Sequence, residues 1–184
     1  MANVIKDVNY FDSFFADLVQ NILGTTQDKV RISYAEEGQV SFKINDNICF
    51  VHTMLEDNFV NKFKNQSLEY IGTEDVFVHS LSVMRVLYLK IVFYGNQSSV
   101  NSVLVSESLH LDNILQKLHN EDLAIIGDRT KLVKTHELIN GRWWERTDLD
   151  LYFYNSIIVE EKPEPIDEVD ITITDADIKV IIDW

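Results

Sequence analysis

Residues 140–153 of this chain read NGRWWERTDLDLYF and indicate a β-strand that starts with two adjacent tryptophans. Apolar and polar residues alternate after this pair, as they do in a strand with one buried face. Successive side chains of a strand point to opposite faces, so one tryptophan can enter a core while the other meets a partner. Aromatic and arginine side chains are typical interface anchors. The candidate interface residues are therefore Arg142, Trp143, Trp144 and Arg146.

The same residues allow a second interpretation, in which they serve only the subunit itself. Both tryptophan rings then pack in the core and at the sheet edge, while the two arginines pair with Glu145 and Asp148. Exposed ion pairs of this kind contribute only about 0–1 kcal/mol to stability. The pairing alone therefore favours neither interpretation, and the sequence leaves both open.

An amphipathic helix is predicted near the N-terminus. Apolar residues recur at helical spacing over residues 10–23 and form one broad stripe. Asn9 is placed to cap the start of this helix, Asp12 lies in its first turn, and Gly24 fits the left-handed position after its end. We expect the stripe to pack in the core.

Three short strands are predicted to follow this helix. Alternating patterns cover residues 30–34, 39–44 and 48–52. The polar residues 45–47, Asn-Asp-Asn, separate the last two, which indicates a β-hairpin.

The middle of the chain holds its longest β-rich run. Residues 76–94 are rich in apolar and β-branched side chains and predict one long strand. Residues 55–72 are mostly polar and predict a long loop or a short helix at a subunit surface. Residues 100–118 fit one apolar helical face, with a break near His110. Residues 124–137 receive no assignment.

Composition is that of a globular protein with a strongly acidic balance. The 184 residues carry a net charge of −14, which argues against a protein that grips nucleic acid through phosphates. An acidic surface would repel DNA and suits a conduit through which DNA slides. No apolar run approaches the ~20 residues that span a bilayer, so no membrane association is expected.

The acidic charge is concentrated in the last residues. From Glu160 onward nine acidic residues face only two lysines, and both prolines of the protein, Pro163 and Pro165, stand at the start of this segment. Proline beside charge marks a hinge, so we expect a domain over residues 1–160 and an extension over residues 161–184. Apolar residues alternate within the extension, which predicts a strand that closes the domain's own sheet or adds to a neighbour's.

Motifs of catalysis are scarce. The six glycines form no phosphate-binding loop, the five histidines show no metal-ligand spacing, and the single cysteine, Cys49, lies between apolar neighbours. Carboxylates are so abundant that any chosen pair is uninformative. We therefore expect no catalytic residue, no cofactor and no metal.

Two segments resemble a known protein family. Residues 94–103, YGNQSSVNSV, resemble a segment of the family that comprises the end of a strand, a Tyr-Gly turn and the start of a helix. Residues 139–155, INGRWWERTDLDLYFYN, resemble the most recognisable segment of the family. Together with the order of elements over about residues 8–160, they resemble the neck and tail terminator proteins of bacteriophages. The resemblance implies an α+β fold, a mainly antiparallel twisted sheet with helices packed on one face and a C-terminal β arm.

The resemblance also implies a structural virion protein. Terminators of this kind form a hexameric ring that caps the tail tube and joins it to the head-neck connector, with DNA passing through the lumen without specific binding. The expected partners are other copies of the chain, the tail tube protein and the head-tail connector or stopper, with the tail sheath as a further candidate. The expected location is the virion tail or neck, after assembly in the host cytoplasm.

Two other classes of function stay open. An acidic cytosolic binding module or inhibitor would occupy a basic partner site, and clustered acids on one face would favour it. An enzyme would need a pocket with perturbed titrating groups.

Overall fold

The computed structural model describes residues 5–34, 38, 41–71, 76–161, 170–174 and 177–181. Its contacts group the chain into two units. The first comprises Met1–Lys64 and Val83–Ile157, and the second comprises Asn65–Ser82 and Ile158–Trp184. Strands β4 and β7 are long enough to contribute to both.

A single open sheet organises the first unit. Its strand order is β1-β2-β4-β7-β5, with β6 paired to β7 beside this path. Strand β1 is parallel to β2, whereas β2 is antiparallel to β4, and both β5 and β6 are antiparallel to β7. The strands are β1 (Val30–Ile32), β2 (Ile48–Leu55), β4 (Val76–Tyr94), β5 (Leu123–Ile125), β6 (Lys131–Ile139) and β7 (Arg142–Glu161).

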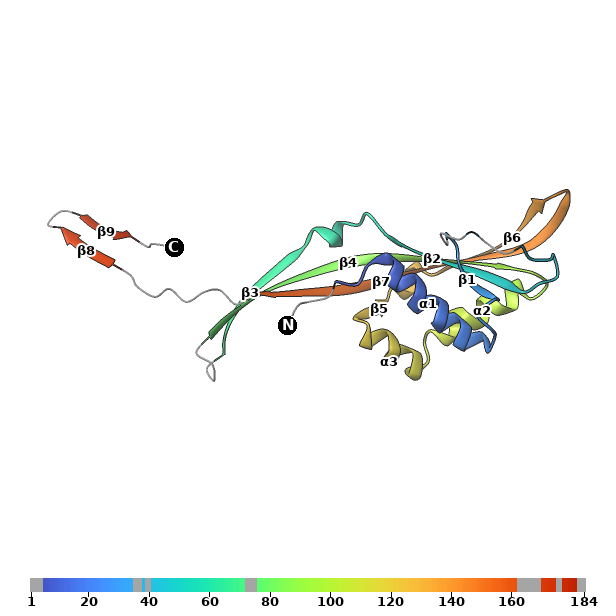
Figure 1. Ribbon diagram of the computed structural model, residues 1–184, viewed down its shortest axis with the longest axis horizontal. Coiled ribbons are helices and arrows are strands. Elements are labelled where there is room, and N and C mark those ends of the chain that lie inside the picture. The colour runs from blue at the N-terminus through green and yellow to red at the C-terminus, as the bar shows by residue number, and fades with distance from the viewer. Residues whose placement is uncertain are drawn as a thin grey trace. The chain divides into compact units, whose positions relative to one another are not determined.

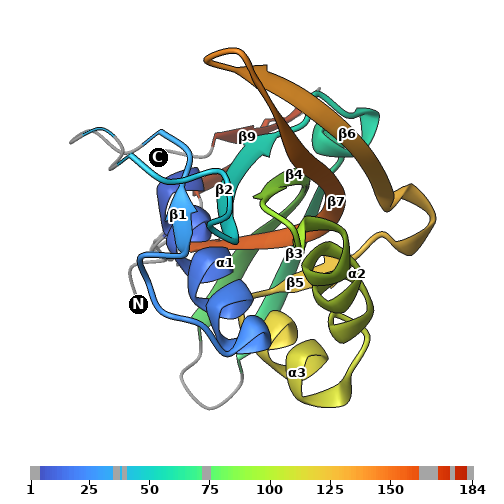
Figure 2. The same ribbon diagram turned by 90° about the vertical axis from the view of Figure 1, so that its right-hand side faces the viewer.

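Three helices, α1 (Val8–Leu23), α2 (Ser98–Ser108) and α3 (Asp112–Asn120), cover one face of this sheet (Figures 1 and 2). The core lies between the helices and the sheet, because alternate residues of the long strands point towards the helices. This arrangement confirms the predicted α+β class. The core includes Phe11, Phe15, Val19, Val51, Leu87, Leu89, Ile91, Phe93, Val105, Leu109, Leu118, Leu149, Leu151 and Phe153.

Helix α1 occurs where the apolar stripe predicts it, but its cap differs. Asp7 rather than Asn9 is the N-cap, since the Asp7 carboxylate accepts a hydrogen bond of 2.8 Å from the Tyr10 N–H. Gly24 ends the helix in the left-handed conformation, as predicted. Asp12 does not serve the first turn: it is buried and accepts from the Thr53 N–H of β2.

The predicted hairpin around residues 45–47 is wrong. Residues 41–47 form a coil with a turn, in which the Asp46 carboxylate accepts a hydrogen bond of 2.8 Å from the Lys43 N–H. Residues 39 and 40 lie outside the described part of the chain. Strand β2 already has β1 on one side and β4 on the other, so a hairpin partner has no free edge to join.

The segment predicted as a loop or short helix contains more structure than expected. A 3-10 helix, η1 (Phe59–Lys62), is followed by β3 (Lys64–Ile71), which pairs with β4. The described side chains of β3 are exposed on both faces, so its sequence lacks the alternation by which a strand is recognised. The continuous strand β4 and the break between α2 and α3 are both confirmed.

The second unit also contains two strands of the acidic extension. Strands β8 (Asp170–Thr174) and β9 (Asp177–Ile181) form a two-stranded antiparallel sheet of their own, in which Ile171 pairs with Val180. The extension therefore contains strands, as its alternation predicts. The division at residue 160 and the role of an arm stay predictions.

Candidate assembly interface

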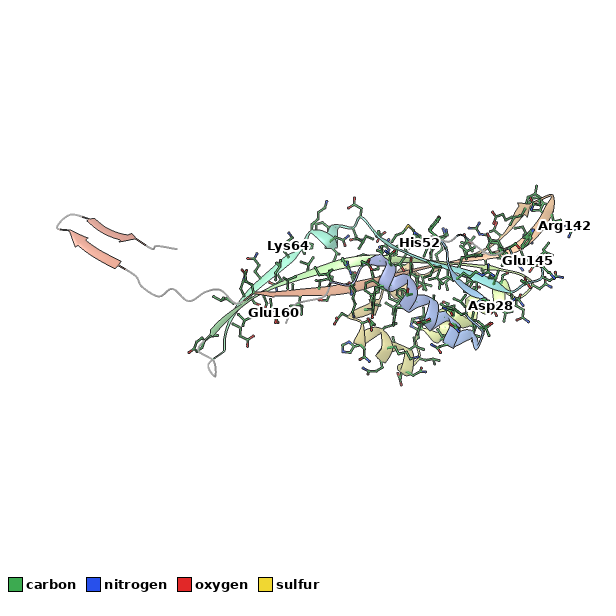
Figure 3. All side chains as sticks on the ribbon, in the orientation of Figure 1. Asp28, His52, Lys64, Arg142, Glu145 and Glu160 are labelled. Carbon is green, nitrogen blue, oxygen red and sulfur yellow. The ribbon has the colours of Figure 1, made fainter. Side chains whose placement is uncertain are left out.

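The tryptophan pair lies in a tight hairpin between β6 and β7. Ile139 pairs with Arg142, which leaves Asn140 and Gly141 as a two-residue turn with φ of 51° and 76°. Positive φ at both positions is the requirement of a type I′ turn, and Asn-Gly is its commonest sequence. The turn therefore fixes the register of the hairpin, and Figure 3 labels Arg142 at its tip.

Trp143 lies on the helix side of the hairpin and faces solvent. The register pairs it with Leu138 of β6, so both side chains share one face. Trp143 is 66% exposed and Leu138 is 56% exposed. The hairpin thus presents an apolar pair that nothing in the described part of the chain covers.

Trp144 points to the opposite face and packs within the subunit. Its ring meets Phe42 edge to face at 5.3 Å and Tyr94 at 6.4 Å, and Phe42 in turn contacts Phe50 at 5.5 Å. The buried indole Nε1 has no hydrogen-bond partner among the described residues. The two tryptophans thus divide as the strand pattern predicts, with Trp144 inside an aromatic cluster and Trp143 outside.

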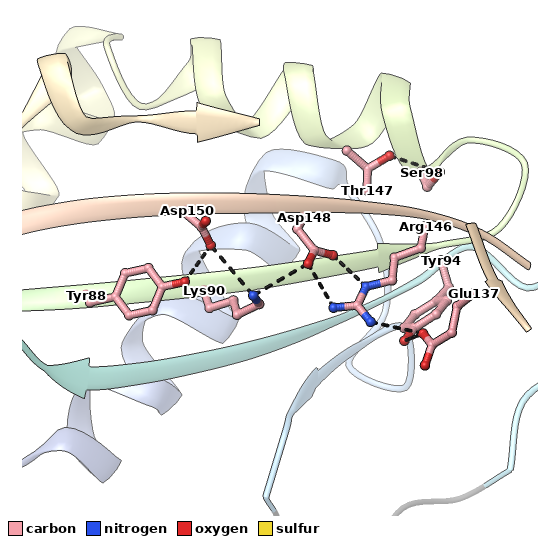
Figure 4. A network of polar contacts seen from close by, with 9 residues as sticks. All are labelled: Tyr88, Lys90, Tyr94, Ser98, Glu137, Arg146, Thr147, Asp148 and Asp150. Atoms are coloured by element: carbon pink, nitrogen blue, oxygen red, sulfur yellow. Dashed lines mark hydrogen bonds and ion pairs between the residues drawn. The ribbon is translucent and has the colours of Figure 1, made fainter. Parts of the chain in front are cut away.

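Arg146 is held by carboxylates of its own subunit (Figure 4). Its Nε and Nη2 donate to the two oxygens of Asp148 at 2.6 and 2.8 Å, and its Nη1 donates to Glu137 at 3.0 Å. The Tyr94 hydroxyl donates to the same Glu137 carboxylate at 2.6 Å. This hydrogen bond and the Arg146 guanidinium lower the pKa of Glu137, while burial and the bond to Glu137 raise the pKa of Tyr94 to about 12.

The network continues along the helix-free face of the sheet. Lys90 lies 3.5 Å from Asp148 and 3.9 Å from Asp150, and the Tyr88 hydroxyl donates to Asp150 at 2.6 Å. Tyr88 stacks on Tyr152 with ring centroids 5.0 Å apart. These contacts pair the charges of this face with one another within the subunit. Arg146 thus follows the second interpretation of the sequence and pairs with Asp148.

The turn between β4 and α2 depends on a glycine. Gly95 has a φ of 99°, and a Cβ at this position would lie 2.5 Å from the Asp46 carbonyl oxygen. On the other side, the Gly95 N–H donates to the Glu145 carbonyl of β7 at 3.2 Å. The Tyr-Gly turn therefore joins the 41–47 loop, α2 and the hairpin.

Helix α2 turns small polar residues inwards and apolar residues outwards. Ser98, Ser102 and Val105 are buried, and the Thr147 hydroxyl donates to Ser98 at 3.3 Å. The apolar spacing predicts this helix correctly, but most of the residues that carry it face solvent. We call this exposed set the α2–α3 patch: Val100, Val103, Leu104, Leu111 and Leu115, which are 66, 47, 46, 54 and 38% exposed.

The model of the phage neck terminator protein family matches residues 11–179. The chain belongs to this family. Membership confirms the resemblance carried by residues 94–103 and 139–155, and it makes the chain a structural component of the phage neck. A comparison with the curated proteins found no match.

The family match reaches further than the sequence resemblance does. It starts in α1 and ends within β9, so it includes most of the acidic extension as well as the hairpin and the α2–α3 patch. The extension is thus a feature that this neck terminator shares with its family model.

Among the described residues of this neck terminator few features suggest catalysis, and its family is a structural one. A hollow of about 370 Å³ between the end of α1 and the start of α2 is lined by amides such as Asn47 and Asn101 together with charged and apolar side chains. Cys49 borders it, and burial raises the pKa of its thiol to about 12. Within the described residues no cluster of His, Cys, Asp and Glu could hold a metal, and no helix could cross a membrane.

Proposed function

We propose that this neck terminator assembles into a closed ring of six copies that caps the tail tube and joins it to the head-neck connector. One observation supports self-assembly above the others: the subunit exposes two separate sets of apolar side chains. These are the hairpin pair Leu138 and Trp143, and the α2–α3 patch. Exposed apolar side chains that are grouped on neighbouring positions mark candidate protein interfaces.

Two different surfaces suit a ring better than a simple dimer. A head-to-tail contact joins one patch of a subunit to a different patch of the next, and it closes into a ring when the rotation between subunits allows. In our account the hairpin tip of one copy contacts the α2–α3 patch of the next. The number six comes from the family resemblance.

The four residues of the tryptophan segment then have two kinds of role. Trp143 and Arg142, both exposed, contact the neighbouring copy, whereas Trp144 and Arg146 position the hairpin through the aromatic cluster and the carboxylates. The ion pairs of Arg146 stay within the subunit, which leaves the contact mainly apolar, as the centres of interfaces are.

The acidic balance fits a ring that conducts DNA. A net charge of −14 opposes phosphate binding, so DNA in the lumen would slide rather than adhere. The tail tube protein and the head-tail connector or stopper are the proposed axial partners, and the tail sheath is a further one. The ring belongs to the virion neck and assembles in the host cytoplasm.

The experiment is the mass of the purified protein by light scattering, alone and mixed with its tail tube protein. A species of ring size, with or without tube, supports the proposal. Trp143→Ala should prevent it, while the matched control Phe59→Ala, which removes an aromatic ring that is 70% exposed on η1, should not. A monomer that ignores the tube contradicts the proposal and favours the acidic binding module.

A further inference from the structure

Strand β6 has one open edge. It pairs with β7 on one side, and no strand joins its other side within the described residues. An unpaired row of N–H and C=O groups is a template for strand addition, which proteins use for recognition and otherwise protect against. Strands β1 and β5 also lie at edges, but each has only three residues against nine in β6.

The open edge of β6 is basic in a chain that is acidic overall. Lys131 and Lys134 are exposed, although Lys134 also lies 4.0 Å from Glu145 of β7, and the one acidic residue of the strand, Glu137, is engaged by Arg146 and Tyr94. The other long edge strand, β3, carries one lysine and one glutamate and has no such excess. The charge of β6 therefore suits an acidic partner.

The C-terminal extension has the complementary properties. It carries nine acidic residues and two lysines from Glu160 onward, and it alternates isoleucine with threonine in β8. Within the described residues β8 and β9 form a two-stranded sheet, and an isolated hairpin is marginally stable in water. A third strand would add hydrogen bonds and a second row of side-chain contacts.

We infer that the C-terminal extension of one copy adds as a strand to the open β6 edge of a neighbouring copy. This inference rests on the proposed self-assembly and names a second contact within it. Donor and acceptor are different surfaces, so in a closed ring every copy gives one extension and receives one. The residues between Glu161 and Asp170 can span at most about 30 Å when extended, which gives the extension reach towards an adjacent subunit.

The test uses full-length chains that each carry one new cysteine. Thr135→Cys on β6 and Thr172→Cys on β8 are made in separate chains, and one chain is labelled with ¹⁵N. The mixture is treated with a short bis-maleimide, so every link between the two positions joins different copies. The native Cys49 is buried, and its raised thiol pKa keeps it unreactive.

Three comparisons make the result specific. We expect links between Thr172→Cys and Thr135→Cys, and few between Thr172→Cys and Ser67→Cys on the competing edge β3. Reversing both lysines, Lys131→Glu with Lys134→Glu, should lower the yield about tenfold, because attraction becomes repulsion. The double variant Lys62→Glu with Lys117→Glu, at exposed positions of η1 and α3, changes the net charge by the same amount and should leave the yield unchanged.

Failure of this inference is distinguishable from failure of the proposed function. If ring-sized particles form but links to β6 are absent, or links to β3 are as frequent, the inference is overturned and the ring stands. If light scattering of the same samples, with tube protein present, shows only monomer, the proposed function itself is contradicted.

Discussion

Leu138 and Trp143 face each other across the β6–β7 hairpin, each one residue away from the Asn140–Gly141 turn, and both are more than half exposed. The turn fixes their register, so the hairpin presents the pair to solvent on one face. Trp144, on the other face, anchors the hairpin. The adjacent tryptophans thereby separate an external contact from an internal one, and each can be tested alone.

Trp143→Ala should abolish assembly and leave the fold intact. Trp143 is 66% exposed, so removal of its side chain should change the free energy of unfolding by no more than about 0.5 kcal/mol. Urea unfolding measures the stability, and light scattering with tube protein measures the assembly. If the Trp143→Ala variant still assembles, Trp143 does not belong to the interface.

Trp144→Ala is the matched comparison for stability and, unlike Trp143→Ala, should destabilise the fold. Its ring packs against Phe42 and Tyr94, so we expect a loss of about 1–3 kcal/mol in the free energy of unfolding. Equal stability of the two tryptophan variants would contradict the division between them.

Leu104→Gln on the α2–α3 patch should weaken assembly without cost to the fold, because Leu104 is 46% exposed. Leu109 lies directly after the end of α2 and is only 2% exposed. Leu109→Ala should therefore lower the free energy of unfolding by about 2–5 kcal/mol. Thermal unfolding and particle mass, measured on both variants, separate the two effects. Normal assembly of the Leu104→Gln variant would show that this part of the α2–α3 patch does not belong to the interface.

Gly95→Ala should destabilise the subunit by about 1–3 kcal/mol, since the left-handed backbone disfavours a side chain and the new Cβ meets the Asp46 carbonyl at 2.5 Å. Gly24→Ala shares the positive φ but has open space around it, so it should cost less. Urea unfolding of both variants tests this, and an equal loss would show that the contact with Asp46 is unimportant.

The subunit should lose stability in acid. The pKa of Glu137 is lowered by Tyr94 and Arg146, and the pKa of Glu56 is lowered chiefly by Arg129. A carboxylate with a lowered folded-state pKa stabilises the fold above its unfolded pKa, and this contribution disappears as the pH falls through the folded value. The free energy of unfolding should therefore be lower at pH 4 than at pH 7.

Glu137→Gln provides the control for this pH dependence. Because glutamine does not ionise, the variant should lose less stability than the wild type between pH 7 and pH 4. Urea titrations at both pH values give the comparison. An identical pH dependence in the two proteins would mean that Glu137 does not contribute to it.

Much of the fold could be predicted from local patterns. The stripe of α1, the long strand β4, the break between α2 and α3 and the strand after the tryptophans all follow from periodicity. Strand β3 could not, because exposure on both faces removes alternation. The hairpin expected at residues 45–47 failed because both edges of β2 are occupied by strands distant in sequence.

The candidate site was predicted in part. Strand geometry alone places Trp143 and Trp144 on opposite faces, and the Asn-Gly turn was available as a hairpin signal. The α2–α3 patch could not be inferred, because periodicity shows that Val100 and Leu104 share a face and does not show whether that face points inwards. The pairing of Arg146 with Glu137 depends on the register of β6, a strand that received no assignment.

The most direct test of the central claim is the number of subunits in the assembled particle, counted by native mass spectrometry after mixing with the tail tube protein. Our account predicts six copies in the wild type and monomers in Trp143→Ala. A wild-type particle with a different number of copies, or a chain that stays monomeric beside its tube, would contradict it.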